Sequence, residues 1–461
     1  MKRQKLPELP VSNPSDVIDP LLSQSSEMVM MATGAPVLSS TTALMHRERW
    51  KQDQSGAPRF VRWFNRPKGS YVAHYVMEDP SASFHPEVLT GRLAWDIVAD
   101  FGVEAARLHL VFAAYATQPE HGPPWMGYSR IRGSDLMKIL GMGRQIRNPD
   151  AGNDGRRFIT KTLKLLRLVK LAQSIARLGV QVFWQDSKRN CSVSLSQMWD
   201  VRIDLHGPIN FQQIVEEPEE VIITVRAGLW AEKFLNSKAT EDKTASTLFQ
   251  YGLLAASTLR INPHQEGLAA RLAVHLTFRS RINKGKSRCK VGSLWQEVLP
   301  DTDLGKRNQF RTKEQRYRMK QRWDNALTSL KKRGWQIEFD DKTYPAEYRP
   351  SWAKEQSNHQ PLPAGYFAKL RQAVLSIGLP EFPTMEPRQE RPAELTPEVI
   401  RRRRTAKQLT QKDLARALGK HQTWVSMLET GKTRATGDEM RRAIIEVLEN
   451  GPQHKTQDGW F

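Results

Sequence analysis

The chain has 461 residues, and its 70 Lys and Arg against 49 Asp and Glu give a formal net charge of +21 at pH 7. This length predicts two to four domains, and the basic excess favours a polyanionic partner. The two cysteines, Cys191 and Cys289, cannot build a disulfide framework, and no apolar run approaches the roughly 20 residues of a membrane span. We therefore expect a cytoplasmic protein that makes no contact with a membrane.

The first predicted segment is a disordered N-terminal tail over residues 1–55. This stretch is rich in Ser, Pro and Met and shows no clear hydrophobic period. Its basic start is followed by Pro7, Glu8 and Pro10 instead of an apolar run, which argues against a signal peptide.

Residues 70–215 show the order helix, short helix, basic helix, hairpin. An amphipathic helix around Leu108 is followed by a short helix that Gly141 ends, and residues 180–195 alternate as a hairpin. The cations predicted to contact DNA from the basic helix are Arg156, Arg157, Lys161 and Lys164. Its predicted inner face carries Phe158, Thr162, Leu165, Leu166 and Val169. This order is that of a winged helix, in which the third helix enters the major groove and the hairpin wing contacts the DNA backbone.

Residues 216–345 repeat this order. A strand at 221–225 precedes the copy, and helices are predicted at about 247–259, 267–281 and 293–297. A long basic helix follows, and the cations predicted to contact DNA from it are Arg316, Arg318, Lys320 and Arg322. Its predicted inner residues are Trp323, Leu327 and Leu330, and Gly334 ends it before a second wing.

The basic helices allow a plainer interpretation, because charge on a helix is usually a solvated face. Here each basic helix follows a short helix and precedes a hairpin, and a further DNA-binding pattern lies downstream. That combination favours contact with DNA. The chain is therefore predicted to be α+β, mainly α with small β wings. Two tandem winged-helix domains would be followed by an all-α helix-turn-helix domain.

Residues 346–397 are predicted to be a Pro-rich linker that contains one short helix. The helix would place Tyr366, Leu370, Val374 and Ile377 on one face. Such a linker would tether the following module loosely.

Residues 398–450 carry the clearest pattern in the chain. Thr410 and Asp413 form a capping signature for one helix, and Gly419 allows the turn after it. A second short helix then places Val425 and Leu428 inside. Its exposed N-terminal end carries Gln422, Thr423 and Trp424, where a recognition helix meets base edges. A closing amphipathic helix follows, and residues 451–461 are predicted to be a flexible tail.

This segment resembles the Cro/cI (XRE-type) helix-turn-helix family. The resemblance implies that Gln411 contacts a phosphate and that Gln422 and Thr423 read bases. The 13 tryptophans suggest well-filled cores, and we expect Trp424 to be an exception that stacks on a sugar or packs at the DNA surface. Two residues depart from the family pattern: His421 stands where a Ser or Thr cap is usual, and Met427 where a basic residue is common. The alternative is a helical bundle used for dimerisation.

The tandem winged-helix order, over about residues 70–345, resembles the TrfA/RepE-type plasmid replication initiators. The resemblance implies a bacterial, nucleoid- or plasmid-associated protein that binds direct repeats at an origin of replication. It further implies opening of an AT-rich segment, recruitment of host replication proteins (a helicase or its loader), and inactive homodimers.

No pattern in the chain predicts catalysis. Residues 280–287 end like a Walker A loop, but Ser280 replaces its first glycine and a helix precedes it. Neither cysteine has neighbours at zinc-ligand spacing. We expect no catalytic residue, cofactor or metal. The leading hypothesis is an initiator that binds double-stranded DNA sequence-specifically. The alternatives are a Cro/cI-type transcriptional repressor and a DNA-processing enzyme such as a relaxase or recombinase.

Overall fold

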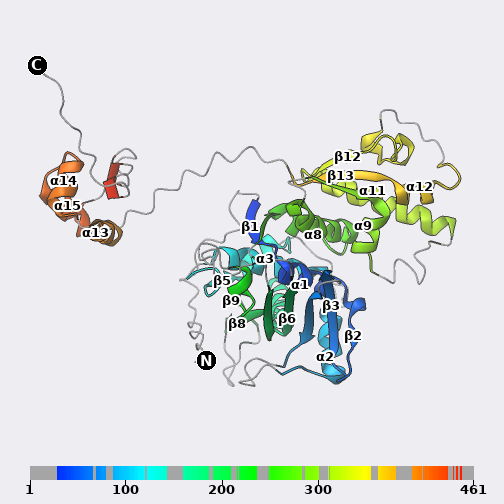
Figure 1. The fold of residues 1–461 in the computed structure, drawn as a ribbon, viewed down its shortest axis with the longest axis horizontal. Helices are drawn as coiled ribbons and strands as arrows, with labels where there is room; N and C mark the ends of the chain where they lie inside the picture. The colour runs from blue at the N-terminus through cyan, green and yellow to red at the C-terminus, as the bar shows by residue number, and fades with distance from the viewer. Residues whose placement is uncertain are drawn as a thin grey trace, which may run out of the picture. The chain divides into compact units, whose positions relative to one another are not determined.

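The computed structural model divides the chain into two compact units, Met1–Glu381 and Phe382–Phe461, each described below by itself (Figure 1). In the first unit it describes residues 28–380 except 66–68, 79–86, 120–121, 143–158, 186–189, 209–214, 216, 236–247, 249, 283–285, 301–309, 311 and 355–361. In the second it describes residues 397–448 except 408, 434–439, 441–442 and 445–446.

The first described elements correct the predicted tail. Strand β1 (Met28–Ala32) pairs with β10 (Tyr251–Ala255), and helix α1 (Ala35–Met45) lies in the core with Val37 and Leu44 fully buried. The prediction of disorder is therefore wrong for residues 28–55, and residues 1–27 lie outside the described part. Because α1 is buried on nearly every side, its sequence carries no polar stripe and shows no helical period.

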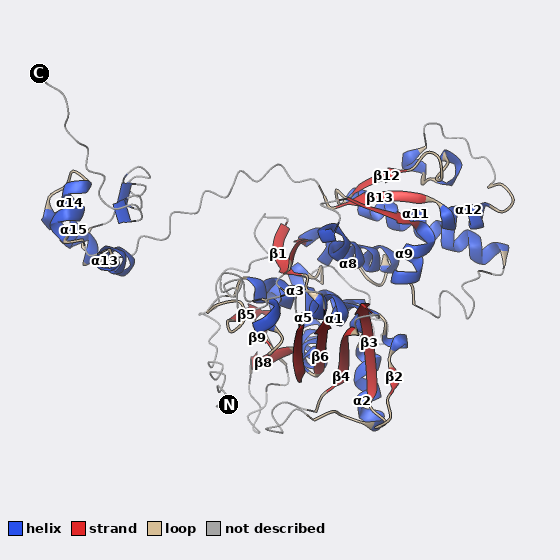
Figure 2. Cartoon of the chain, viewed as in Figure 1, coloured by secondary structure: helices blue, strands red, loops and turns tan. Residues whose placement is uncertain are grey.

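A five-stranded antiparallel sheet forms one layer of this half of the unit. Its order is β2 (Lys51–Gln52), β3 (Pro58–Asn65), β4 (Ser70–Val76), β6 (Leu178–Gln185) and β7 (Asn190–Gln197), as Figure 2 shows in part. The predicted hairpin at 180–195 is present as β6 and β7. It extends β4 and is not the wing that the sequence suggested, because its strands pair into this larger sheet.

A second, three-stranded sheet lies beside the helices of the first copy. The helices are α2 (Gly91–Asp100), α3 (Val103–Thr117), α4 (Gly133–Ile139) and α5 (Lys161–Ala176). The strands are β5 (Tyr128–Arg132), β9 (Glu220–Ala227) and β8 (Trp199–His206), with β9 in the middle. A domain boundary at 215/216 is therefore wrong, because it would cut between two paired strands of one sheet.

Buried tryptophans hold these layers together. The Trp199 indole is fully buried and donates to Nδ1 of His109 on α3 at 2.8 Å. The Trp230 indole donates to the Met198 carbonyl at 2.7 Å, and the two tryptophan rings meet edge to face. Burial lowers the pKa of His109 to about 4, so its imidazole is neutral and can accept the indole proton.

The second half of the unit has its own core. Helix α6 (Ala231–Phe234) and the single turn α7 (Ala256–Leu259) precede it, and Ala231, Phe234 and Leu259 still pack in the first core. The second core is built by α8 (Gly267–Ile282), β11 (Lys286–Lys290), α9 (Val291–Val298), α11 (Lys313–Lys332) and β12 (Gln336–Phe339). Strand β13 (Val374–Gly378) lies between β11 and β12. The predicted helix over 247–259 is wrong, since the described residues there form β10 and the single turn α7.

The predicted linker is also shorter than expected. Helix α12 (Tyr366–Gln372) confirms the short helix, but Val374 and Ile377 belong to the central strand β13. Leu370 and Leu375 are fully buried, so residues up to 380 are part of the first unit. Residues 381–396 lie outside the described part.

The two halves share one connectivity apart from one insertion in each. The first runs α3, β5, α4, α5, β8, β9, with the β6–β7 hairpin inserted after α5, and the second runs α8, β11, α9, α11, β12, β13, with α12 inserted before β13. In both sheets the first strand pairs with the last, and the last pairs with the second. The unit is thus α+β, with a larger β content than the expected small wings.

The second unit is a helical module. Helices α13 (Pro397–Ala406), α14 (Gln411–Ala417) and α15 (Gln422–Glu429) pack with the described residues of a further helix around a small core. The core residues are Ile400, Leu414, Ala415, Val425, Leu428, Ile444 and Leu448. The Thr410–Asp413 capping box is confirmed, and Gly419 takes a φ of 61° in the turn before α15.

Candidate nucleic-acid interface

Helix α11 presents the most open basic face among the described residues of the first unit. Thr312 caps it with a full capping box, which fixes where it begins. Trp323, Leu327 and Leu330 are fully buried, as predicted from their spacing. The Trp323 indole donates to the Tyr344 hydroxyl at 3.0 Å, which anchors the middle of the helix.

Arg318 and Arg322 lie one turn apart on the exposed side of α11. Arg318 pairs with Glu314 across one turn, and both side chains are largely exposed. Such an exposed pair contributes less than about 1 kcal/mol, so a phosphate can compete for the guanidinium. Arg316 is also exposed, and its Nε donates to the Phe310 carbonyl at 2.9 Å.

Lys320 does not belong to this face. Its side chain is only 7% exposed and forms an ion pair with Asp324 one turn later. Burial lowers the pKa of Lys320 and raises that of Asp324, each partly offset by the opposite charge of its partner. The prediction that Lys320 contacts DNA is wrong, because the neighbouring hydrophobic positions turn it toward the core.

Three uncharged residues on the exposed side of α11 were missed by the sequence analysis. Tyr317, Gln321 and Asn325 follow one another at four-residue spacing and are all exposed. Amides of Gln and Asn can bond adenine bidentately in the major groove, while Arg can bond guanine. The signal in the sequence was the i, i+4 spacing of the two amides beside Arg318 and Arg322.

Helix α5, the counterpart of α11, has its cations engaged within the protein. Lys161 donates to the Glu219 carbonyl at 2.6 Å, and Arg167 and Lys170 pair with Glu104 and Asp100 at 2.5 and 2.7 Å. Lys164 is half-buried, and Arg156 and Arg157 lie outside the described residues. DNA contact by this helix stays a prediction.

The hydrophobic face of α5 also differs from the predicted one. Leu165, Leu168 and Leu171 are buried, whereas Leu166 is exposed and Val169 half-buried. The inward face is therefore rotated from the one predicted, because several leucines in this helix fit more than one helical stripe.

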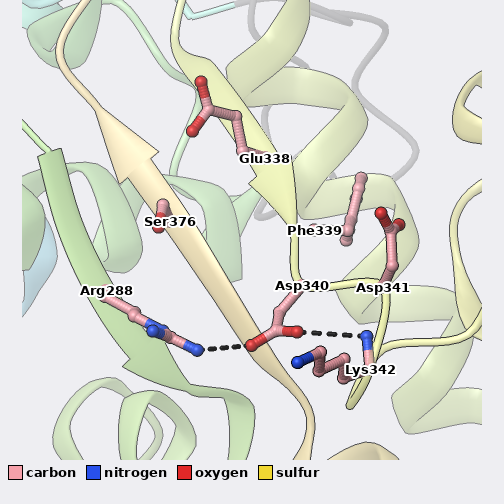
Figure 3. A pocket seen from close by; sticks show the side chains of 7 residues that line it. All are labelled: Arg288, Glu338, Phe339, Asp340, Asp341, Lys342 and Ser376. Carbon is pink, nitrogen blue, oxygen red and sulfur yellow. Dashed lines mark hydrogen bonds and ion pairs between the residues drawn. The ribbon is translucent and has the colours of Figure 1, made fainter.

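A cavity of about 460 Å³ opens on the β11–β13–β12 sheet (Figure 3). Arg288 and Asp340 pair at its edge at 2.5 Å, and the Lys342 backbone N–H donates to Asp340 at 3.1 Å. Glu338 and Asp341 add two more carboxylates to the lining. Three acidic groups against two cations in its lining disfavour a phosphate here.

In the second unit, Gln411 and Arg404 hold one buried carboxylate. The Gln411 amide donates to Glu429 at 2.8 Å, and Arg404 donates to it at 2.6 and 3.1 Å. Burial raises the pKa of Glu429, but these bonds outweigh burial and lower it overall. Gln411 thus ties α14 to α15. Contact between Gln411 and a DNA phosphate stays a prediction. It would use the second amide hydrogen of Gln411, which is not bonded to Glu429.

The exposed end of α15 is capped by an unusual residue. Nδ1 of His421 accepts from the Thr423 N–H at 3.5 Å and lies 2.8 Å from the Thr423 hydroxyl. A backbone N–H can only donate, so this nitrogen is the acceptor in the cap. His421 therefore fills the role of the usual Ser or Thr cap. Gln422 and Thr423 are exposed, while Trp424 is half-buried against the module's core.

Comparison with known proteins supports this module. Residues 400–444 match the helix-turn-helix family model. These residues therefore form an XRE-type helix-turn-helix domain, and the chain binds DNA through it. No curated protein matches the chain.

One solved structure, domains 2 and 3 of RctB, aligns with 9% identity over 74% of this chain and 98% of that chain. Its TM-score is 0.32, which is too low to relate the two folds.

Other kinds of site find no support in the part of the chain that the structure describes. No helix there is long and apolar enough to cross a membrane. Within the same residues, no group of three His, Cys, Asp or Glu side chains is placed to hold a metal ion.

Proposed function

We propose that this protein is a plasmid replication initiator that binds direct repeats at its origin. The observation that carries the proposal is the connectivity shared by the two halves of the first unit. Helix, strand, two helices and two strands, with the last strand in the middle of the sheet, is the plan of a winged helix. In this proposal two winged-helix domains precede the helix-turn-helix in one chain.

In this proposal α11 is the recognition helix of the second winged helix. It follows the short helix α9, as a third helix must, and its open face carries Arg318, Gln321, Arg322 and Asn325. Those side chains combine phosphate contacts with base-reading groups. Helix α5 occupies the same position in the first winged helix.

Two winged helices allow one monomer to span successive major grooves on one face of the duplex, about one helical turn apart. Monomers on adjacent repeats would then strain a neighbouring AT-rich segment, where flexible steps are easily deformed. The protein would act by binding alone, without catalysis or cofactor. The host would supply the helicase or its loader. Homodimers would be inactive, and monomers would bind the origin.

A transcriptional repressor is the second candidate. One observation favours it: Arg167 and Lys170 of α5 are held in ion pairs with less exposed carboxylates than the one that Arg318 of α11 meets, so DNA must displace more at the first copy. A repressor needs only its helix-turn-helix domain and one further contact with DNA. Repeats of about 20 base pairs beside an AT-rich stretch would favour initiation, and a lone palindrome would favour repression.

The deciding experiment is plasmid maintenance. A plasmid with the origin of this protein's own replicon and no other initiator gene is transformed into cells that do or do not make the protein. We expect maintenance only in its presence, and its loss with Arg318→Ala/Arg322→Ala. Arg92→Ala/Lys369→Ala removes the same charge from exposed positions on other helices and should maintain the plasmid. Equal maintenance without the protein refutes initiation.

A further inference from the structure

The outward face of α15 carries no charge. Glu429 is the only carboxylate on this helix, and it is buried and bonded to Arg404 and Gln411. The exposed helix residues are Gln422, Thr423 and Met427, with Ser426 half-buried. A recognition helix of this composition cannot make the bidentate Arg or Lys contact to guanine, which is the commonest specific contact in the major groove.

Met427 is the apolar residue on that face. It lies one turn after Thr423, while Val425 and Leu428 on the other side are buried in the module's core. Its side chain is 41% exposed, so packing within the domain does not account for it. In the major groove the apolar feature of a base edge is the C5-methyl group of thymine, and apolar side chains recognise it by contact.

The cap of the helix adds a second apolar group. The Thr423 hydroxyl is bonded to His421 at 2.8 Å, so the methyl group is the part of this exposed side chain that remains for contact with DNA. Gln422 beside it offers an amide, whose donor and acceptor match N7 and N6 of adenine. Both kinds of group on this face therefore fit A·T pairs.

We propose that Met427 is a specificity-determining residue that reads the methyl group of a thymine, within an A·T-rich site on which Gln422 reads an adenine. The inference rests on the helix-turn-helix domain alone. It stands whether the protein initiates replication or represses transcription, because either activity needs this domain to find its site.

The first part of the test is selection from a random duplex library. Full-length wild type and the full-length Met427→Ala variant are each used to select DNA, and the base positions whose preferences differ are assigned to Met427. We expect one base pair to change, from a thymine preference to none. A wild-type motif that Met427→Ala leaves unaltered overturns the proposal.

The second part removes only the methyl group. Deoxyuridine replaces the assigned thymine, and binding of full-length protein is measured by fluorescence anisotropy. Loss of one buried methyl group should weaken wild type about fourfold. Met427→Ala should bind both duplexes equally, and Met427→Leu, which keeps an apolar contact, should still discriminate.

The matched control is Met126→Ala, because Met126 is also 41% exposed but belongs to the other unit. This variant should discriminate as wild type does. Equal binding of wild type to the two duplexes, or undiminished discrimination by Met427→Ala, overturns the proposal. Failure of the plasmid-maintenance test leaves both measurements unaffected, so the two ideas fail separately.

Discussion

Replacing Arg318 and Arg322 together should flatten the salt dependence of DNA binding. Each phosphate contact on B-form DNA contributes about 0.9 to the slope of log K against log salt. Both guanidinium groups are on the open side of α11, so the double Ala variant should lose about 1.8 from that slope. Between 50 and 200 mM salt, where salt rises about fourfold, the variant's affinity should fall about 12-fold less than that of wild type.

The assay is fluorescence anisotropy of the full chain on a duplex of arbitrary sequence, at about four salt concentrations in this range. The helix-turn-helix domain contributes equally to both proteins, so the difference in slope belongs to α11. Arg92→Ala/Lys369→Ala serves as the control for net charge and should keep the wild-type slope. An unchanged slope in the α11 variant would refute the reasoning and leave α11 as a solvated helix face.

Three further predictions follow from individual contacts. Glu314→Gln should tighten DNA binding about twofold by anisotropy. In wild type Arg318 must give up its exposed ion pair with Glu314, worth about 0.3–0.5 kcal/mol, before it can bind a phosphate, and the variant has no such pair. Weaker binding by the variant would contradict this. Lys320→Ala should lower the free energy of unfolding, measured with a chemical denaturant, by about 2 kcal/mol. This is less than the loss expected for a fully buried ion pair, because the Asp324 side chain is 26% exposed. The salt dependence of DNA binding should be unchanged. The pKa of Glu429 is lowered from 4.5, so its bonds stabilise the module fully above that pH and are lost as pH falls through the folded-state value. The thermal stability advantage of wild type over Glu429→Gln should therefore shrink as the pH falls below 4.5, and a constant advantage would rule the mechanism out.

Features set by local chemistry could be predicted from the sequence. The Thr410–Asp413 capping box, the turn at Gly419 and the inner face of α11 each depend on residues within one or two helical turns. Such signals survive in any tertiary context. They located the helix-turn-helix, and they placed α11 where a third helix of the repeated pattern belongs.

Features set by distant pairing could not be predicted in this way. Strand β12 ends at Phe339 and its partner β13 begins at Val374, so no short hairpin signal joins them. Helix α1 lacks a period because it is buried on nearly every side. Lys320 looked like its basic neighbours in sequence, and only the packing of α11 directs it to Asp324.

The two proposed recognition helices differ in what DNA must displace. On α11 a phosphate competes with the exposed Arg318–Glu314 pair, which is worth about 0.3–0.5 kcal/mol. On α5 it must open two partly buried pairs, Arg167–Glu104 and Lys170–Asp100, at a combined cost of about 1–2 kcal/mol. For these three ion pairs alone, that difference favours α11 by up to about tenfold. Arg167 also contacts His264, just ahead of α8, at 3.2 Å. Opening α5 would therefore loosen a contact between the two halves of the unit. We expect the second copy to bind DNA first. The first copy should follow only where its contacts with a cognate repeat offset the cost of breaking the α5 ion pairs.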